Sequence, residues 1–256
     1  MDVQESAGPK IVRQRLDQVL VMRGLVQSRA RAADLIARGA VTVEGRIARK
    51  AGVLVEADIE ITVDALANAH VARSGAKLVA ALEAFGFDPA GRVALDVGAS
   101  TGGFTQVLLE GGVKRVYAVD VGRGQLHETL RANPRVISME GQDARALSRE
   151  LVIDPAEAIV ADVSFLSLRQ ALPVPLQLAA PACWLVALVK PQFEAGRAAV
   201  GKRGVVRDEA AHKRALEDVA AFLEAAGWRV IGSLPSPLRG KEGNTEWLIG
   251  AVLGDG

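Results

Sequence analysis

Between residues 95 and 104 the chain reads Leu95-Asp96-Val97-Gly98-Ala99-Ser100-Thr101-Gly102-Gly103-Phe104, and this segment decides the fold. It follows an apolar strand pattern and leads into a helical pattern, which is the context that a nucleotide-binding glycine loop requires. Glycine at such a turn lets the backbone approach a ligand that a Cβ atom would exclude. Gly98 and Gly102 are separated by three residues, so the dinucleotide pattern G-x-G-x-x-G is not met.

Strand and helix patterns alternate from Arg92 onward. The candidate strands are Val93–Asp96, Val116–Asp120, Val136–Met139, Ile159–Ala161, Trp184–Val189, Arg229–Ser233 and Glu246–Val252. The candidate helices are Phe104–Glu110, Arg145–Glu150 and Glu209–Ala226, with Asp208 as the N-cap of the last. This alternation predicts an α/β fold, in which helices cover both faces of a mostly parallel, Rossmann-like sheet of seven strands.

Three acids stand at or just after the ends of successive strands. A carboxylate two residues before the first glycine would repel a pyrophosphate, so Asp96 is better placed near a cationic group such as the amino group of methionine. Asp120 can accept hydrogen bonds from both hydroxyls of a ribose, and Asp143 can accept one from an adenine amino group. Two alternatives stay open: a glycine turn that only packs strand against helix, and a nicotinamide-dependent dehydrogenase.

A smaller α/β module is predicted before this region. Its helices are expected from Leu16 and over Arg29–Arg38, the second capped by Ser28 and followed by Gly39. Its strands are expected at Val41–Val43, Arg46–Ala48, Val53–Val55 and Ile59–Val63, the first two joined by a Glu44-Gly45 turn. Between Lys10 and Lys50, ten lysines and arginines against three acids give a net charge of +7, on a chain whose total is +1. This basic block indicates a polyanionic partner, with an ordinary solvated face as the alternative.

Cys183 is the only cysteine, which excludes an internal disulfide and fits a reducing compartment. It lies in an apolar run, where a buried, inert thiol is expected. No signal peptide is expected at the N-terminus, because residues 1–15 lack an apolar core. The charge-free stretch from Ala171 to Val189 contains three prolines, so we expect a helix end, a turn and a short buried strand there, and no membrane span. The expected location is the cytoplasm.

The glycine segment resembles motif I of S-adenosylmethionine-dependent methyltransferases. The arginine-bearing helices and the run Val41-Thr42-Val43-Glu44-Gly45-Arg46 resemble the S-four RNA-binding domain over about Val12–Val63. Further motifs occur in the order seen in the TlyA family: Ser74-Gly75-Ala76-Lys77-Leu78, Val119-Asp120-Val121-Gly122-Arg123-Gly124-Gln125-Leu126, Ala161-Asp162-Val163-Ser164-Phe165 and Leu188-Val189-Lys190-Pro191-Gln192-Phe193-Glu194.

This resemblance to the TlyA family implies both an architecture and an activity. The family joins an S-four domain to an FtsJ-like domain and methylates ribose 2′-hydroxyls of ribosomal RNA; some members were once labelled hemolysins. It implies an S-four-like domain at residues 10–64, a linker at 65–76 and an FtsJ-like methyltransferase domain at 77–254, whose last strand inserts antiparallel. The implied cofactor is S-adenosylmethionine, and the implied partner is ribosomal RNA or a ribosomal subunit.

FtsJ-like enzymes use a Lys-Asp-Lys-Glu tetrad, which the resemblance carries over to Lys77, Asp162, Lys190 and Glu246. A sulfonium methyl donor is already activated, so the protein has to align a weakly acidic hydroxyl with the methyl carbon and help it lose its proton. Lys190 is the expected base, assisted by Lys77, because desolvation and repulsion between two ammonium groups would favour a neutral amine. Asp162 and Glu246 would orient the two amines. Taken singly, each residue has a plain alternative, such as a surface cation or a helix cap.

The remaining site predictions follow from the same motifs. The expected cofactor-binding residues are Asp96, Gly98, Ser100, Thr101, Gly102, Gly103, Phe104, Asp120, Val121, Asp143 and Asp162. The expected RNA-binding residues of the N-terminal module are Arg13, Arg15, Arg29, Arg31, Arg38, Arg46, Arg49 and Lys50. Two basic loops, residues 196–207 and 235–244, add Arg197, Lys202, Arg203, Arg239 and Lys241. The three histidines lack the spacing of a metal site, so no metal is proposed.

Three other functions compete with ribose methylation. The first is an RNA-binding assembly factor that has lost methyltransferase activity, against which the complete tetrad argues. The second is a membrane-active cytolysin, which the prolines in the apolar stretch disfavour. The third is methylation of a base, for which an aromatic-flanked Asn-Pro-Pro-Tyr type of motif would be expected in place of Ala161-Asp162-Val163-Ser164-Phe165.

Overall fold

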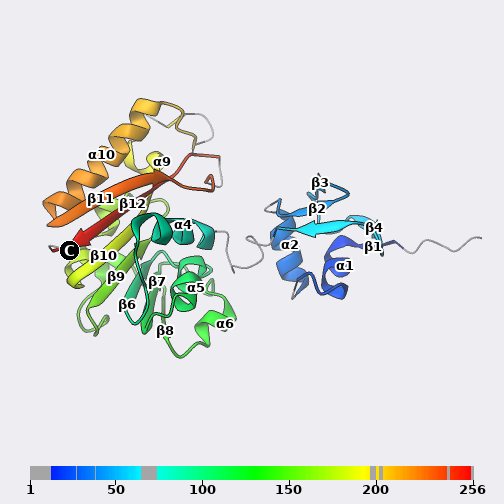
Figure 1. Cartoon of the computed structure of the whole chain (residues 1–256), viewed down its shortest axis with the longest axis horizontal. Helices are drawn as coiled ribbons and strands as arrows, with labels where there is room; N and C mark the ends of the chain where they lie inside the picture. The colour runs from blue at the N-terminus through cyan, green and yellow to red at the C-terminus, as the bar shows by residue number, and fades with distance from the viewer. Residues whose placement is uncertain are drawn as a thin grey trace, which may run out of the picture. The chain divides into compact units, whose positions relative to one another are not determined.

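The computed structural model describes residues 13–26, 28–37, 39–64, 74–196, 200–201, 204–240 and 243–254. Contacts within the chain divide it into two compact units, Met1–Ala69 and His70–Gly256 (Figure 1). The first unit contains the expected small module, and the second contains the expected sheet.

The smaller unit consists of helices and short strands around one apolar core. Its helices are α1 (Leu16–Met22) and α2 (Arg29–Ala37), and its strands are β1 (Arg13–Arg15), β2 (Val41–Val43), β3 (Arg46–Ile47), β4 (Leu54–Glu56) and β5 (Ile61–Val63). Leu16, Leu20 and Leu35 are fully buried between the helices and the strands. The two helices and the hairpin of β2 and β3 confirm the prediction. Strand β1 was not predicted, because a three-residue Arg-Gln-Arg strand has no apolar alternation; it pairs antiparallel with β4.

The larger unit is built on a seven-stranded sheet with the strand order β11-β12-β10-β9-β6-β7-β8. In chain order the strands are β6 (Val93–Val97), β7 (Arg115–Asp120), β8 (Val136–Glu140), β9 (Ala156–Ala161), β10 (Ala179–Val189), β11 (Trp228–Pro235) and β12 (Trp247–Leu253). Strands β6 to β10 are parallel, whereas β12 is inserted antiparallel between β10 and β11. The expected mostly parallel sheet and its antiparallel last strand are confirmed.

Helices cover both faces of this sheet, as Figure 1 shows. They are α4 (Gly75–Phe85), α5 (Gly103–Glu110), α6 (Glu128–Arg131), α7 (Leu168–Ala171), α8 (Pro173–Gln177), α9 (Pro191–Glu194) and α10 (Glu209–Ala225), with a 3₁₀ turn η1 at Ala144–Ala146. Helices α4 and α5 pack on one face, and α7, α8 and α10 enclose the core on the other. All five residues of the central strand β6 are therefore buried, as expected for a parallel strand covered on both sides.

Besides β1, several elements differ from the sequence prediction; β9, for example, begins at Ala156, three residues before the predicted start. The helix expected over Arg145–Glu150 was wrong: only the turn η1 forms, because Asp143 accepts the Arg145 N–H and Leu147 is already extended at φ −68° and ψ 153°. Strand β10 is longer than expected and begins at Ala179, with an irregular register before Trp184. The stretch 171–189 thus divides into helical turns and a strand, and in the part of the chain that the structure describes no helix has the length and apolarity needed to cross a bilayer.

Candidate functional site

The glycine segment makes the turn from β6 into α5, at the carboxyl end of the parallel strands. Gly98 has φ +86°, and a Cβ atom there would lie 2.6 Å from the main-chain oxygen of Asp162. The Gly98 and Ala99 N–H groups both donate to the Val119 carbonyl oxygen of β7, at 2.9 and 3.0 Å. The turn therefore needs glycine for its conformation and for the close approach of the Asp162 backbone.

Asp96 is completely buried beside this turn, with a side chain that is only half satisfied. Its Oδ2 accepts a hydrogen bond of 2.6 Å from the Thr105 hydroxyl of α5. Its Oδ1 is buried without a hydrogen-bond partner among the described residues. Burial raises the pKa of the Asp96 carboxyl to about 7, and the negative charge of Asp162 adds to the shift. An unpaired buried carboxylate oxygen is costly, so it marks a position where a cationic ligand group would be favourable.

A cavity of about 610 Å³ lies at this end of the sheet, within the size range of small-molecule sites. Of the residues predicted to bind a cofactor, Gly98, Ser100, Asp120, Val121, Asp143 and Asp162 line it. Thr101, Gly102, Gly103 and Phe104 continue the turn into α5, where Phe104 is buried in the core. Asp96 itself is fully buried and is not among the residues that line the cavity, so the predicted residues include part of the lining and the turn that shapes it.

Asp120 and Asp143 are both engaged with their own loops. The Asp120 carboxylate accepts the N–H groups of Ser100 and Gly122, at 2.9 and 2.7 Å. Asp143 caps the turn η1 and pairs with Arg145, whose hydrogen bonds hold the pKa of the Asp143 carboxyl below its usual range. Each carboxylate is therefore fixed in position at the cavity wall.

The four residues of the predicted tetrad form two lysine–carboxylate pairs. Lys77 Nζ, in the first turn of α4, lies 2.5 Å from Glu246 Oε2, directly before β12. Lys190 Nζ, at the end of β10, lies 2.6 Å from Asp162 Oδ1, at the end of β9. Lys77, Lys190 and Glu246 are buried. Buried ions need partners, and each of the two pairs supplies one.

Sequence reasoning assigned no role to two residues of the Ala161–Phe165 motif, one that contacts Lys190 and one that lines the cavity. The Ser164 hydroxyl lies 3.0 Å from Lys190 Nζ, so the amine has a second polar partner. Phe165 has φ +68° and a side chain that is 93% exposed, and it lines the cavity. The sequence contained a signal for Phe165: it is an aromatic residue three positions after Asp162, in a motif in which only Asp162 was assigned a role.

The basic residues of the smaller unit fall into different environments. Arg13 pairs loosely with Glu56 at 3.8 Å, whereas Arg15 and Arg29 both contact the buried Asp17. Arg31 was expected to face solvent or a ligand, but its side chain is only 17% exposed and pairs with Asp34. The other described cations of the prediction are Arg46 in β3 and Arg49 and Lys50 in the segment after it, all exposed.

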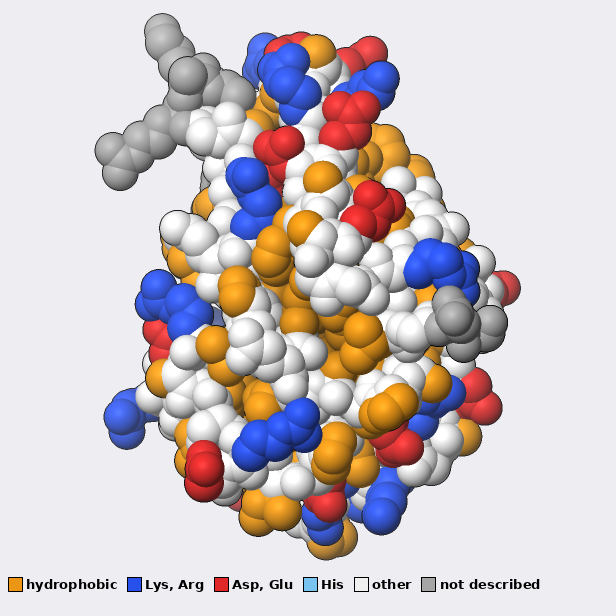
Figure 2. Space-filling view, turned by 90° about the vertical axis from the view of Figure 1, so that its left-hand side faces the viewer, with side chains coloured by type: hydrophobic (Ala, Val, Ile, Leu, Met, Phe, Trp, Pro, Cys, Tyr) orange, Lys and Arg blue, Asp and Glu red, His pale blue; other side chains and the backbone are white. Residues whose placement is uncertain are grey.

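The two basic loops are described only in part. Arg239 is exposed and near the Gly243 carbonyl oxygen, at 3.5 Å. Arg38, Arg197, Lys202, Arg203 and Lys241 lie outside the described residues. On the face drawn in Figure 2, the coloured cations alternate with acids around a central group of hydrophobic side chains and form no continuous basic patch.

Comparison with known proteins places these two units in described families. Residues 70–252 match the family model of FtsJ-like methyltransferases, and residues 14–61 match that of the S4 domain. The chain is 44% identical, over 93% of its length and 89% of the relative's, to the 16S/23S rRNA (cytidine-2′-O)-methyltransferase TlyA of Mycobacterium tuberculosis. It is 37% identical to hemolysin A of Brachyspira hyodysenteriae, over 93% of this chain and all of that protein.

A solved structure resembles nearly the whole chain as well. A protein of Streptococcus thermophilus named as a hemolysin superimposes with a TM-score of 0.75 at 37% identity, covering 96% of this chain and 90% of the other. The likeness extends over both units and is accompanied by substantial sequence identity.

Proposed function

Because the chain belongs to the TlyA family, in which an S4 domain precedes an FtsJ-like methyltransferase domain, we propose that it transfers the methyl group of S-adenosylmethionine to a ribose 2′-hydroxyl of ribosomal RNA. The observation that carries this proposal is the pair of lysine–carboxylate contacts at the carboxyl end of the sheet. The rRNA specificity in the name of the 44% identical relative, and the S4 domain, support RNA as the substrate. The cytoplasm, where ribosomal RNA is found, is the location that fits this substrate.

The residues around the cavity match the chemistry of the cofactor. The unpaired Oδ1 of Asp96 is a buried acceptor for a cationic group, which the amino group of the methionine moiety supplies. Asp120 and Asp143, on successive loops of the cavity wall, are acceptors for ribose hydroxyls and for an adenine amino group. When bound, S-adenosylmethionine supplies an electrophilic methyl group on a sulfonium sulfur.

Lys190 is the residue to which we assign the proton of the 2′-hydroxyl. An ammonium group has three hydrogens, and Asp162 and Ser164 lie at hydrogen-bonding distance from Nζ. One position of the nitrogen is thereby left for the substrate oxygen. Once the Lys190 ammonium has released one proton, its amine accepts the hydroxyl proton there, and Asp162 stabilises the ammonium that forms again. Lys77, held by Glu246, adds positive charge that favours the developing alkoxide.

The exposed ring of Phe165 gives the cavity a surface suited to a nucleic acid. RNA is recognised largely through unstacked bases that stack on aromatic side chains. Phe165 borders the cavity, and its ring lies 5.8 Å from that of Phe193, at 49°. We assign to Phe165 a contact with the base of the target nucleotide, which would hold its ribose near Lys190.

Transfer of a labelled methyl group tests the proposed function. The full chain is incubated with radiolabelled S-adenosylmethionine and unmodified ribosomal RNA of both subunits, and 2′-O-methylated positions are mapped. We expect label in RNA, and a loss of at least about 100-fold in kcat with Lys190→Ala. Lys213→Ala is the matched control, since Lys213 is an exposed lysine of α10 that pairs with Glu217. Binding of RNA and cofactor without any transfer would instead identify an inactive assembly factor.

A further inference from the structure

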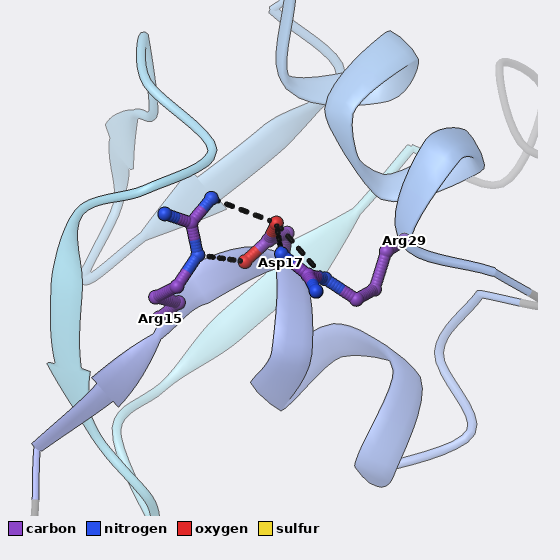
Figure 3. A network of polar contacts seen from close by, with 3 residues as sticks. All are labelled: Arg15, Asp17 and Arg29. Carbon is purple, nitrogen blue, oxygen red and sulfur yellow. Dashed lines mark hydrogen bonds and ion pairs between the residues drawn. The ribbon is translucent and has the colours of Figure 1, made fainter.

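A buried carboxylate joins two arginines in the smaller unit (Figure 3). The Asp17 side chain is 5% exposed, whereas those of Arg15 and Arg29 are 45% and 54% exposed. Arg15 donates from Nε and Nη2 to the two oxygens of Asp17, at 3.0 Å each. Arg29 donates from Nε and Nη2 to Oδ2, at 3.3 and 3.0 Å.

The backbone of Asp17 is fixed by a hydrogen bond of its own, and the two arginines come from different elements. Asp17 lies in the first turn of α1, and its N–H group donates to the Ala51 carbonyl oxygen at 3.0 Å. Arg15 ends β1 and Arg29 begins α2, so the two guanidinium groups come from separate elements. Hydrogen bonds from Arg15 lower the pKa of the Asp17 carboxyl to about 2, against the opposing effect of burial. The carboxylate therefore stays ionised at every pH near neutrality.

This arrangement leaves binding capacity on both arginines. A guanidinium has five N–H donors, and Asp17 accepts from two in each arginine, so with respect to the described residues three in each are left for another acceptor. The three residues together carry a net charge of +1. Planar guanidinium groups bind phosphate oxygens through paired N–H donors, and a guanidinium that Asp17 has already oriented loses less entropy on binding.

We propose that Asp17 is a positioning residue that sets Arg15 and Arg29 as a clamp for one phosphate group of the RNA backbone. The proposal rests on the proposed function, because the RNA substrate supplies the phosphate. Asp17 is negatively charged, yet under this proposal it increases the affinity of the smaller unit for RNA.

Asp17→Asn tests this assignment, because a clamp and a simple change of net charge predict opposite changes in the affinity for RNA. Removing a negative charge raises the attraction for RNA, so general electrostatics predicts tighter binding. Loss of the clamp predicts weaker binding. Asp58→Asn is the matched control, since it makes the same charge change at an exposed turn residue of the same unit. With the full chain and ribosomal RNA, we expect Asp17→Asn to raise the Kd at least about fivefold and Asp58→Asn to leave it equal or lower.

A second variant separates positioning from folding. Arg15→Lys keeps the charge and an ion pair with Asp17 but removes the planar fork. We expect it to raise the Kd for RNA at least about threefold, with a thermal midpoint within about 1 °C of the wild type. For Asp17→Asn, the slope of the logarithm of the RNA-binding constant against the logarithm of salt concentration should decrease by about one. That is the change expected when one phosphate contact is lost.

The outcomes that overturn the clamp leave the proposed function intact. If Asp17→Asn binds RNA as tightly as Asp58→Asn, or Arg15→Lys binds like the wild type, Asp17 is only a structural ion-pair partner. Methyl transfer by the wild-type chain is measured separately. Its absence would contradict the proposed function, whatever the affinities show.

Discussion

Asp96→Asn should stabilise the protein at pH 8 in the absence of cofactor, and the gain should shrink at acidic pH. The Asp96 carboxyl is fully buried, and burial raises its pKa to about 7. A raised pKa means that the folded state holds a proton which the unfolded state, with a pKa near 3.8, has released. Stability from this group is therefore complete below about pH 4 and is lost as the pH rises through 7.

The size of the effect follows from these two pKa values. Linkage gives a loss of about 2 kcal/mol of wild-type unfolding free energy between about pH 5.5 and pH 8 from this group alone. The asparagine of the variant does not titrate, so the difference between variant and wild type should change by the same amount. For a domain of this size, that corresponds to a relative change of roughly 4–8 °C in the thermal midpoint.

Urea denaturation of both proteins at about pH 5.5 and pH 8, without cofactor, measures the change. Because the two proteins differ only at residue 96, titrating groups that do not interact with that residue cancel in the comparison. Calorimetric titration with S-adenosylmethionine at pH 8 should show affinity reduced at least about tenfold in Asp96→Asn, since a neutral amide replaces the partner of the amino group. A stability difference that is equal at the two pH values, or unchanged cofactor affinity, would refute the reasoning.

Three further substitutions test the site. Lys77→Met leaves Glu246 buried without its partner and should cost about 3–5 kcal/mol in urea denaturation, most of it recovered by adding Glu246→Gln; a cost below about 1 kcal/mol would contradict a buried ion pair. Gly98→Ala places a Cβ atom 2.6 Å from a main-chain oxygen, so it should abolish measurable cofactor binding in calorimetry, whereas Gly86→Ala, at a similar φ with open space, should keep it. Phe165→Ala should change stability by less than about 0.5 kcal/mol, because the ring is 93% exposed, and raise the KM for RNA about tenfold; an unchanged KM would exclude a stacking role.

Much of the architecture could be predicted from local patterns. Apolar runs located the parallel strands of the large sheet, because burial on both faces of a parallel strand leaves a continuous apolar signal in the chain. The glycine segment identified the turn from β6 to α5, because a positive φ at Gly98 restricts which residues can occupy that position. The helix expected after Asp143 failed, because side-chain capping ended it after a single 3₁₀ turn.

By itself the sequence determined most strands of the large sheet, its glycine turn and the residue types at the strand ends, though it missed β1 and predicted a helix after Asp143 where only a 3₁₀ turn forms. Only the tertiary structure decided how those residues combine: Lys77 meets Glu246 across 169 positions, and Lys190 meets Asp162 across two neighbouring strands. The same holds for the unpaired oxygen of Asp96, the exposed ring of Phe165 and the two arginines on Asp17. Periodicity and capping act over a few residues, whereas pairing and desolvation depend on strand order and packing, which bring distant segments together.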